Sequence, residues 1–133
     1  MDDKEIDTGV SLYDFNRANM GQFPILSTEE ELNGAKNIIL DFLCRDEMSY
    51  YMLLNHETRY FTLFEFSNGV KSDGRREAMA NDVIECMLNC RYGILDICYD
   101  NAGTALEVWV KDLDTDTVYM YLLFPYDFGV IVY

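Results

Sequence analysis

Few side chains in this sequence have the type and spacing that chemistry requires. His56 and Glu57 are adjacent, and a histidine beside a carboxylate could perform general acid–base catalysis near neutral pH. No motif places a serine or cysteine nucleophile beside this pair, and both residues fall in a predicted hairpin loop. We therefore expect an exposed loop histidine, with an enzyme built from His56 and unrecognised carboxylates as the weakest alternative.

An acidic turn near the C-terminus resembles the start of a calcium-binding loop. Asp112, Asp114 and Asp116 alternate along the chain, and carboxylates at alternate positions could surround a hard cation. A calcium loop of this type needs glycine at its sixth place and glutamate at its twelfth, where this chain has Thr117 and Leu123. The pattern therefore favours a solvated hairpin turn, and we expect no metal there.

The four cysteines do not have the spacing of a structural zinc site. Cys44, Cys86, Cys90 and Cys98 form no CxxC pair, and His56 is the single histidine. Free, buried thiols in a reducing cytosol are the simpler interpretation. We expect no cofactor.

A basic cluster precedes the second predicted long helix. Lys71, Arg75 and Arg76 could grip an anion together with amide groups at the helix start, although no glycine-rich phosphate motif accompanies them. In so acidic a chain, surface ion pairs worth about 0–1 kcal/mol each are the simpler interpretation.

Charge is the strongest global signal. The chain has 24 Asp and Glu against 10 Lys and Arg, a net charge of -14 over 133 residues. The excess lies in residues 1–47, with a net of -7, and in residues 94–133, with a net of -6. Such a surface repels nucleic acid and anionic membranes and attracts basic proteins. Because half of the residues are hydrophobic and 14% are aromatic, the acid belongs to a folded domain rather than to a disordered tail.

The elements that must position these residues follow from apolar periodicity and turn signals. We expect residues 1–10 to be flexible, and the Ser27–Glu30 capping box to start the first long helix. The predicted helices are 11–20, 28–45 and 74–90, and the predicted strands are 49–54, 60–66, 94–100, 105–112, 117–124 and a short edge strand 128–133. Grouped strands with short turns favour an α+β fold, one domain over 1–133, with an antiparallel meander of about five strands and two main helices on one face.

The strand at 105–112 has an alternating pattern. Its pattern predicts a buried face of Leu106, Val108 and Val110 and a half-wet face of Glu107, Trp109 and Lys111. No stretch has the roughly 20 apolar residues of a membrane-spanning helix. The acidic N-terminus lacks the apolar core of a signal peptide, which favours a cytoplasmic protein.

Three segments resemble those of small, uncharacterised acidic proteins from phages and conjugative elements of Firmicutes. They are Ser11–Asn16, Met48–Phe66 and Phe124–Val130. The resemblance implies a cytoplasmic protein of a mobile element, and it implies no activity and no catalytic residues. Anti-defence inhibitors of such elements, anti-CRISPR proteins among them, are often small and acidic.

These observations favour a non-enzymatic module that binds a basic protein, and they leave open plain solubility as the purpose of the charge. In the sharper hypothesis, surface carboxylates imitate nucleic-acid phosphates and occupy the basic cleft of a nucleic-acid-binding enzyme. The candidate partner-binding residues are Glu29, Glu30, Glu31, Asp46, Glu47, Asp112, Asp114 and Asp116. The alternative is an assembly protein that forms a homodimer through Val118–Phe124 and Phe128–Tyr133.

Overall fold

The computed structural model describes residues 19–45, 50–65, 73–125 and 127–133. Its elements are the 3-10 turn η1 (Met20–Gln22), α2 (Glu29–Leu43), β2 (Tyr50–Leu54), β3 (Phe61–Glu65), α3 (Asp73–Asn89), β4 (Tyr92–Tyr99), β5 (Leu106–Asp112), β6 (Val118–Leu123) and β7 (Phe128–Val132). The predictions of a flexible 1–10 segment and of a helix over 11–20 lie outside the described residues, apart from Asn19 and Met20.

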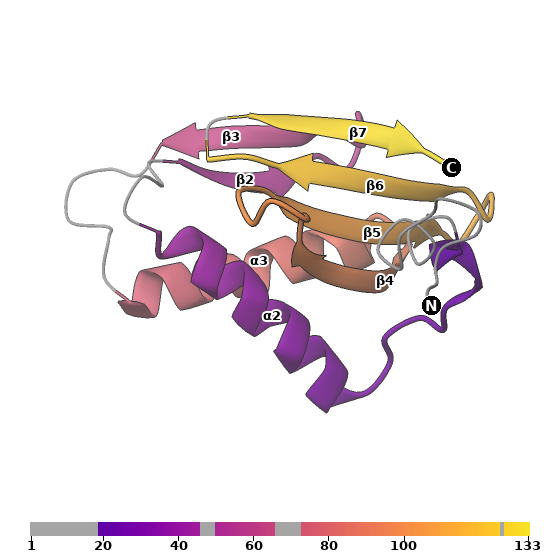
Figure 1. The fold of residues 1–133 in the computed structure, drawn as a ribbon, viewed down its shortest axis with the longest axis horizontal. Coiled ribbons are helices and arrows are strands. Elements are labelled where there is room, and N and C mark those ends of the chain that lie inside the picture. Colours follow the sequence, from indigo (N-terminus) through magenta and orange to yellow (C-terminus); the bar gives the residue numbers. More distant parts are fainter. Residues whose placement is uncertain (1–18, 46–49, 66–72, 126) are drawn as a thin grey trace, which may run out of the picture.

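The predicted α+β class is confirmed, with helices packed against antiparallel strands. Strands β4, β5, β6 and β7 form a four-stranded meander in that order, and β2 and β3 form a separate hairpin. There are thus six described strands in two sheets, whereas the sequence indicated about five in one meander. Helices α2 and α3 pack on each other and against β4, and Figure 1 shows both below the four-stranded sheet.

Helix α2 begins one residue later than predicted. Thr28, not Ser27, is the N-cap, and its hydroxyl accepts a hydrogen bond from the Glu31 amide at 3.1 Å. The Glu31 carboxylate accepts from the Thr28 amide at 3.1 Å and completes the capping box. The predicted Ser27–Glu30 box was therefore wrong by one position, because two adjacent hydroxyl residues each precede a glutamate by three places.

The main core lies between the helices, the hairpin and one face of the four-stranded sheet. Helix α2 buries Ile39 and Phe42, α3 buries Val83 and Met87, and the hairpin adds Phe61. These positions recur at helical spacing, as the sequence pattern predicted for both helices. Each fully buried side chain of this size contributes about 1.5–3 kcal/mol of hydrophobic stabilisation, so the docking of the helices contributes strongly to the stability of the fold.

The second face of the sheet is buried at Glu107 and Trp109, which corrects the prediction of a half-wet face at these two positions, whereas Lys111 is half-buried. Trp109 is 0% exposed and Glu107 is 1% exposed, and the Trp109 indole donates a 2.9 Å hydrogen bond to the Glu107 carboxylate. Met20 from η1 packs against Trp109 and Met120 in a second apolar cluster. Alternation in a strand indicates which residues share a face, but it carries no information about which distant segment covers that face.

Candidate functional site

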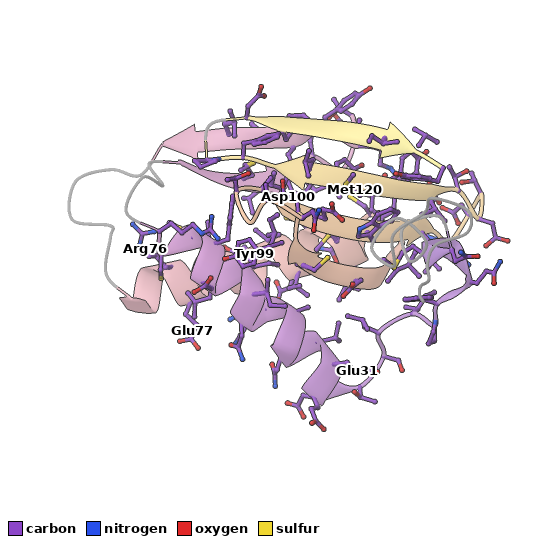
Figure 2. The ribbon with its side chains drawn as sticks, in the orientation of Figure 1. Glu31, Arg76, Glu77, Tyr99, Asp100 and Met120 are labelled. Carbon is purple, nitrogen blue, oxygen red and sulfur yellow. The ribbon has the colours of Figure 1, made fainter. Side chains whose placement is uncertain are left out.

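Exposed carboxylates are concentrated on the two helices. Helix α2 has four acidic residues and one basic residue, and α3 has four acidic and two basic residues, a net charge of -5 for the two together. We name the exposed set the helical acidic face: Glu29, Glu30, Glu31, Asp41, Glu77, Asp82 and Glu85. In Figure 2 the labelled Glu31 and Glu77 project away from the sheet. Among the residues that the structure describes, seven exposed carboxylates thus lie on α2 and α3.

Glu31 is the member of this face with the most fixed geometry. Its carboxylate accepts from the Ser27 amide at 2.9 Å and from the Thr28 amide at 3.1 Å. These backbone hydrogen bonds lower the pKa of Glu31. The helix dipole also favours a negative charge at this end of α2. Glu31 is therefore an ionised carboxylate held at the start of α2.

A cavity of about 220 Å³ lies between α2 and β4 and has two carboxylates in its lining. Glu31 comes from α2 and Asp96 from β4. The remaining lining residues are Leu26, Gly34, Ala35, Ile38 and Ile97. We name this cavity the α2–β4 pocket. Its combination of apolar wall and carboxylates matches a long basic side chain, which has an apolar stem and a charged head.

Asp96 lies directly after a β-bulge in β4. The register between β4 and β5 shifts between Ile94 and Asp96, so that Asp96 lies opposite Trp109. One Asp96 carboxylate oxygen accepts from the Ile97 amide at 2.9 Å. Burial raises the pKa of Asp96. A cation placed beside Asp96 would act in the opposite direction and favour the ionised carboxylate. Sequence reasoning missed Asp96, since an isolated aspartate in a strand gives no sign of which helix will pack against that strand.

Two other members of the helical acidic face have defined partners. Lys36 lies 3.7 Å from the Glu77 carboxylate, and Asp41 accepts a hydrogen bond from the Tyr99 hydroxyl. The Arg45 guanidinium lies over the Tyr99 ring, 4.3 Å from its centre. Burial, followed by the hydrogen bond to Asp41, raises the pKa of Tyr99 to about 12. These contacts join α2 to α3 and to the end of β4.

The predicted acidic turn between β5 and β6 is a hairpin turn with internal partners. Asp112 is only 7% exposed and lies 3.4 Å from the Arg59 guanidinium. Its carboxylate also accepts from the Asp114 amide at 2.9 Å, and Asp114 pairs with Arg91 at 3.0 Å. Among the residues that the structure describes, no group of three or more His, Cys, Asp or Glu side chains is placed to hold a metal ion. Asp112 is thus engaged inside the protein, whereas Asp114 and Asp116 are exposed.

The eight candidate partner-binding residues do not form one patch. In Figure 1 the N-terminal end of α2 is the lower tip of the molecule, and the turn between β5 and β6 lies at the right-hand end of the sheet. Asp46 and Glu47 lie outside the described residues. The structure therefore joins Glu29, Glu30 and Glu31 to the acids of α2 and α3 and separates them from Asp114 and Asp116.

The basic cluster and the cysteines depart from expectation in part. Arg76 is 6% exposed and is therefore not on the surface; it lies on the same side of α3 as the buried Met79 and Ala80. Lys71 and the Arg75 side chain lie outside what the structure describes. All four cysteines are free as predicted, but only Cys90 is buried, and Cys44 is exposed.

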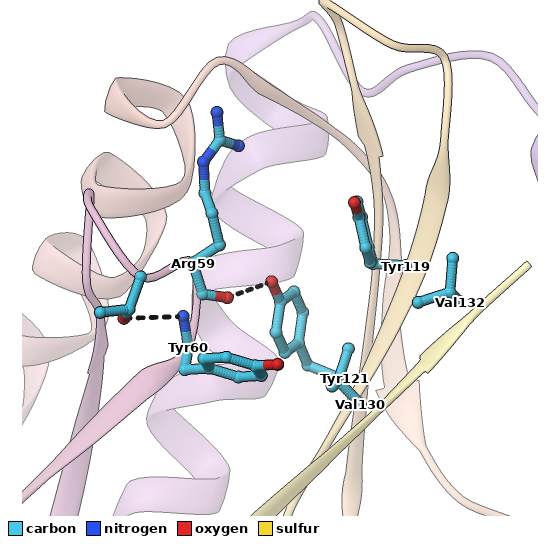
Figure 3. A pocket seen from close by; sticks show the side chains of 7 residues that line it. Arg59, Tyr60, Tyr119, Tyr121, Val130 and Val132 are labelled. Atoms are coloured by element: carbon cyan, nitrogen blue, oxygen red, sulfur yellow. Dashed lines mark hydrogen bonds between the residues drawn. The ribbon is translucent and has the colours of Figure 1, made fainter.

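A second cavity of about 210 Å³ lies between the hairpin loop and the sheet (Figure 3). Arg59 and Tyr60 line it from the hairpin, and Tyr119 and Tyr121 line it from β6. The Tyr121 hydroxyl donates a 2.6 Å hydrogen bond to the Arg59 carbonyl, and the Arg59 guanidinium lies 4.8 Å from the centre of the Tyr92 ring. These contacts fix the hairpin onto the sheet. No pattern in the sequence predicted this cavity.

His56 lies apart from both cavities. It is exposed in the hairpin turn, and it lines neither the α2–β4 pocket nor the tyrosine-lined cavity.

Neither α2 nor α3 combines the length and the apolar character that crossing a membrane requires. No family model matches the chain, and neither a curated protein nor a solved structure is similar to it.

Proposed function

We propose that this protein is a non-enzymatic binding module that binds a basic protein partner through its helical acidic face. The observation that carries the proposal is the α2–β4 pocket, where Glu31 and Asp96 line a cavity with apolar walls. An arginine or lysine side chain of the partner would lay its stem along Ala35 and Ile38 and bring its charge to the two carboxylates. Such a side chain would be the anchor of the interface.

The charge of the whole molecule supports association with a basic surface. A net charge of -14 steers basic proteins toward this one and speeds the encounter at low ionic strength. Charges spaced along α2 and α3 would then contact the basic surface around the anchor. Because salt screens such contacts over about 10 Å at 0.1 M, the complex should weaken as salt is added.

The specific version of this proposal is an inhibitor that imitates nucleic acid. A protein that binds DNA or RNA presents rows of lysine and arginine to phosphates, and exposed carboxylates on two packed helices offer the same charge. We place this activity in the cytosol, in keeping with the resemblance to proteins of phages and conjugative elements. The partner would then be a nucleic-acid-binding enzyme of the host cell.

The test is affinity capture of basic proteins from a bacterial lysate at about 0.05 M and about 0.5 M salt. The pocket variant is Glu31→Gln with Asp96→Asn, which removes two charges while glutamine keeps the capping box. The matched control is Glu57→Gln with Asp116→Asn, which removes two exposed charges elsewhere. We expect wild type and control to retain a basic protein at low salt only, and the pocket variant to retain less of it.

Two outcomes would overturn the proposal. Equal retention by the pocket variant and wild type would remove the α2–β4 pocket from the interface. If the amount of basic protein retained did not fall as salt is added, the binding would not be electrostatic. The inhibitor version has its own test, since added duplex DNA should release a partner that is held at its nucleic-acid site, and failure to do so would leave a general binding module.

A further inference from the structure

Strand β7 is an unpaired edge of the four-stranded sheet. It pairs with β6 on one side, and among the described residues no strand pairs with its other side. Figure 1 shows it along the upper rim of the molecule. An edge of this kind exposes a row of backbone donors and acceptors that can pair with another chain. The side chains and charge of this edge indicate what kind of chain would pair with it.

The ladder to β6 shows which backbone groups face outward. Tyr133 donates to the Val118 carbonyl at 2.8 Å, and Phe124 donates to the Asp127 carbonyl at 2.7 Å. Hydrogen-bonded residues alternate along an antiparallel pair, so 127, 129, 131 and 133 use their backbone groups toward β6. The N–H and C=O groups of Phe128, Val130 and Val132 therefore point to the free edge.

This edge is apolar and uncharged. Residues 128–133 contain no acidic or basic side chain in a chain of net charge -14. Val132 is 61% exposed, Tyr133 50% and Ile131 45%. A basic segment would find no carboxylate along these residues, whereas a second copy of the same edge would bring no like charge into contact. The charge pattern therefore selects a second copy of this chain over a basic partner.

We propose that two copies of this protein associate by antiparallel pairing of β7 with β7, about a two-fold axis at Val130. Val130 then pairs with Val130 of the second copy, and Phe128 pairs with its Val132. The outward groups of both strands match in this register and form about six hydrogen bonds. The contact is isologous and closes after two copies, and it goes beyond the proposed binding function.

The side chains are complementary in the same register. Gly129 has open space where a side chain would be, and Ile131 of the second copy comes to lie directly opposite it. On the other face, Val132 of the second copy lies beside Phe128, whose ring centre is 6.1 Å from that of the exposed Tyr60. Ile131 and Val132 of each copy thus meet an apolar neighbour or an open space, and Tyr133 lies opposite Asp127 of the second copy.

Analytical ultracentrifugation tests the association, over roughly 1–200 µM protein and about 0.05–0.5 M salt. We expect a particle of twice the 15.5 kDa chain mass, with a dissociation constant that falls as salt screens the repulsion between two acidic copies. Ile131→Glu should raise the dissociation constant at least about tenfold. Leu113→Glu, at a similarly exposed position of 46%, should leave it unchanged.

A second variant and a cross-link test the register. Val130→Pro removes an N–H that the ladder to β6 does not use, so the dimer should be lost while the thermal melt stays cooperative. With the exposed Cys44 replaced by serine, Val130→Cys should form an interchain disulfide, because directly paired residues are about 5.5 Å apart. Val132→Cys should not. A monomer under all conditions, or a dimer that survives both Ile131→Glu and Val130→Pro, would overturn the proposal.

Discussion

The Tyr121 hydroxyl gives the sharpest test of how the hairpin is held on the sheet. Tyr121 is fully buried on β6, and its hydroxyl donates to the Arg59 carbonyl at 2.6 Å and lies 3.2 Å from the Tyr92 hydroxyl. Its ring packs edge-on against Phe61 with centres 5.0 Å apart. Tyr121→Phe removes the hydroxyl and keeps the ring, so it isolates the hydrogen bonds from the packing.

The expected loss of stability follows from the groups left behind. A typical hydrogen bond contributes about 0.5–1.5 kcal/mol net, and leaving a buried partner unsatisfied costs about 1–3 kcal/mol. The Arg59 carbonyl is partly buried, so water can replace some of its lost bond. We therefore expect Tyr121→Phe to lower the free energy of unfolding by about 1–2 kcal/mol, which for a domain of this size is a fall in Tm of roughly 3–10 °C.

Urea denaturation measures this change, with Trp109 fluorescence as the probe because it is the single tryptophan and is buried. Tyr119→Phe is the matched control. Its ring stacks 5.8 Å from that of Tyr92, but its hydroxyl makes no hydrogen bond to any residue the structure describes. The control should change stability by less than about 0.5 kcal/mol. Equal effects of the two substitutions would refute the assignment of the hairpin contact to the Tyr121 hydroxyl.

Three further predictions concern the helix cap, the second face of the sheet and alkaline pH. Thr28→Ala should lower the free energy of unfolding by about 1 kcal/mol, and Ser27→Ala should leave it almost unchanged. A larger loss for Ser27→Ala in urea denaturation would indicate that Ser27 is the N-cap. Trp109→Ala should cost about 3–5 kcal/mol because the indole is buried, whereas a cost below about 1 kcal/mol would indicate a wet face. The raised pKa of Tyr99 means that the fold favours its neutral phenol, so this stabilisation is full below pH 10 and is lost as pH rises toward about 12. Tyr99→Phe should therefore make the urea midpoint less dependent on pH above 10, and an unchanged dependence would contradict the assignment.

Local patterns were sufficient to predict most of the elements. The apolar spacing of Ile39, Phe42 and Leu43 defines α2, and the turn residues between strands separate β4, β5 and β6. These signals depend on a few neighbouring residues. The cap of α2 was misplaced by one residue because Ser27 and Thr28 offer equivalent hydroxyls, and only the backbone geometry of the extended Thr28 decides between them.

Contacts between distant residues could not be predicted in the same way. Arg59 pairs with Asp112 across 53 positions, and Met20 of η1 packs against Trp109 of β5. The α2–β4 pocket brings together Glu31 of α2 and Asp96 of β4, which are far apart in the sequence. The sequence thus predicted the acidic character of the candidate site, but the pairing of carboxylates within it required the fold.

The two proposals concern opposite edges of one sheet, and this separates their tests. Strand β4, with the α2–β4 pocket, and strand β7 are the outer strands of the four-stranded meander. A dimer through β7 would leave both pockets free, so it could hold two basic anchors at once. Ile131→Glu should then weaken the dimer without abolishing capture of a basic protein, and Glu31→Gln with Asp96→Asn should weaken capture without changing the dimer mass. Salt adds a second distinction, because it should weaken capture and strengthen the dimer. If one substitution abolished both properties, the two surfaces would have to be parts of a single interface, and the geometry argued for each would be wrong.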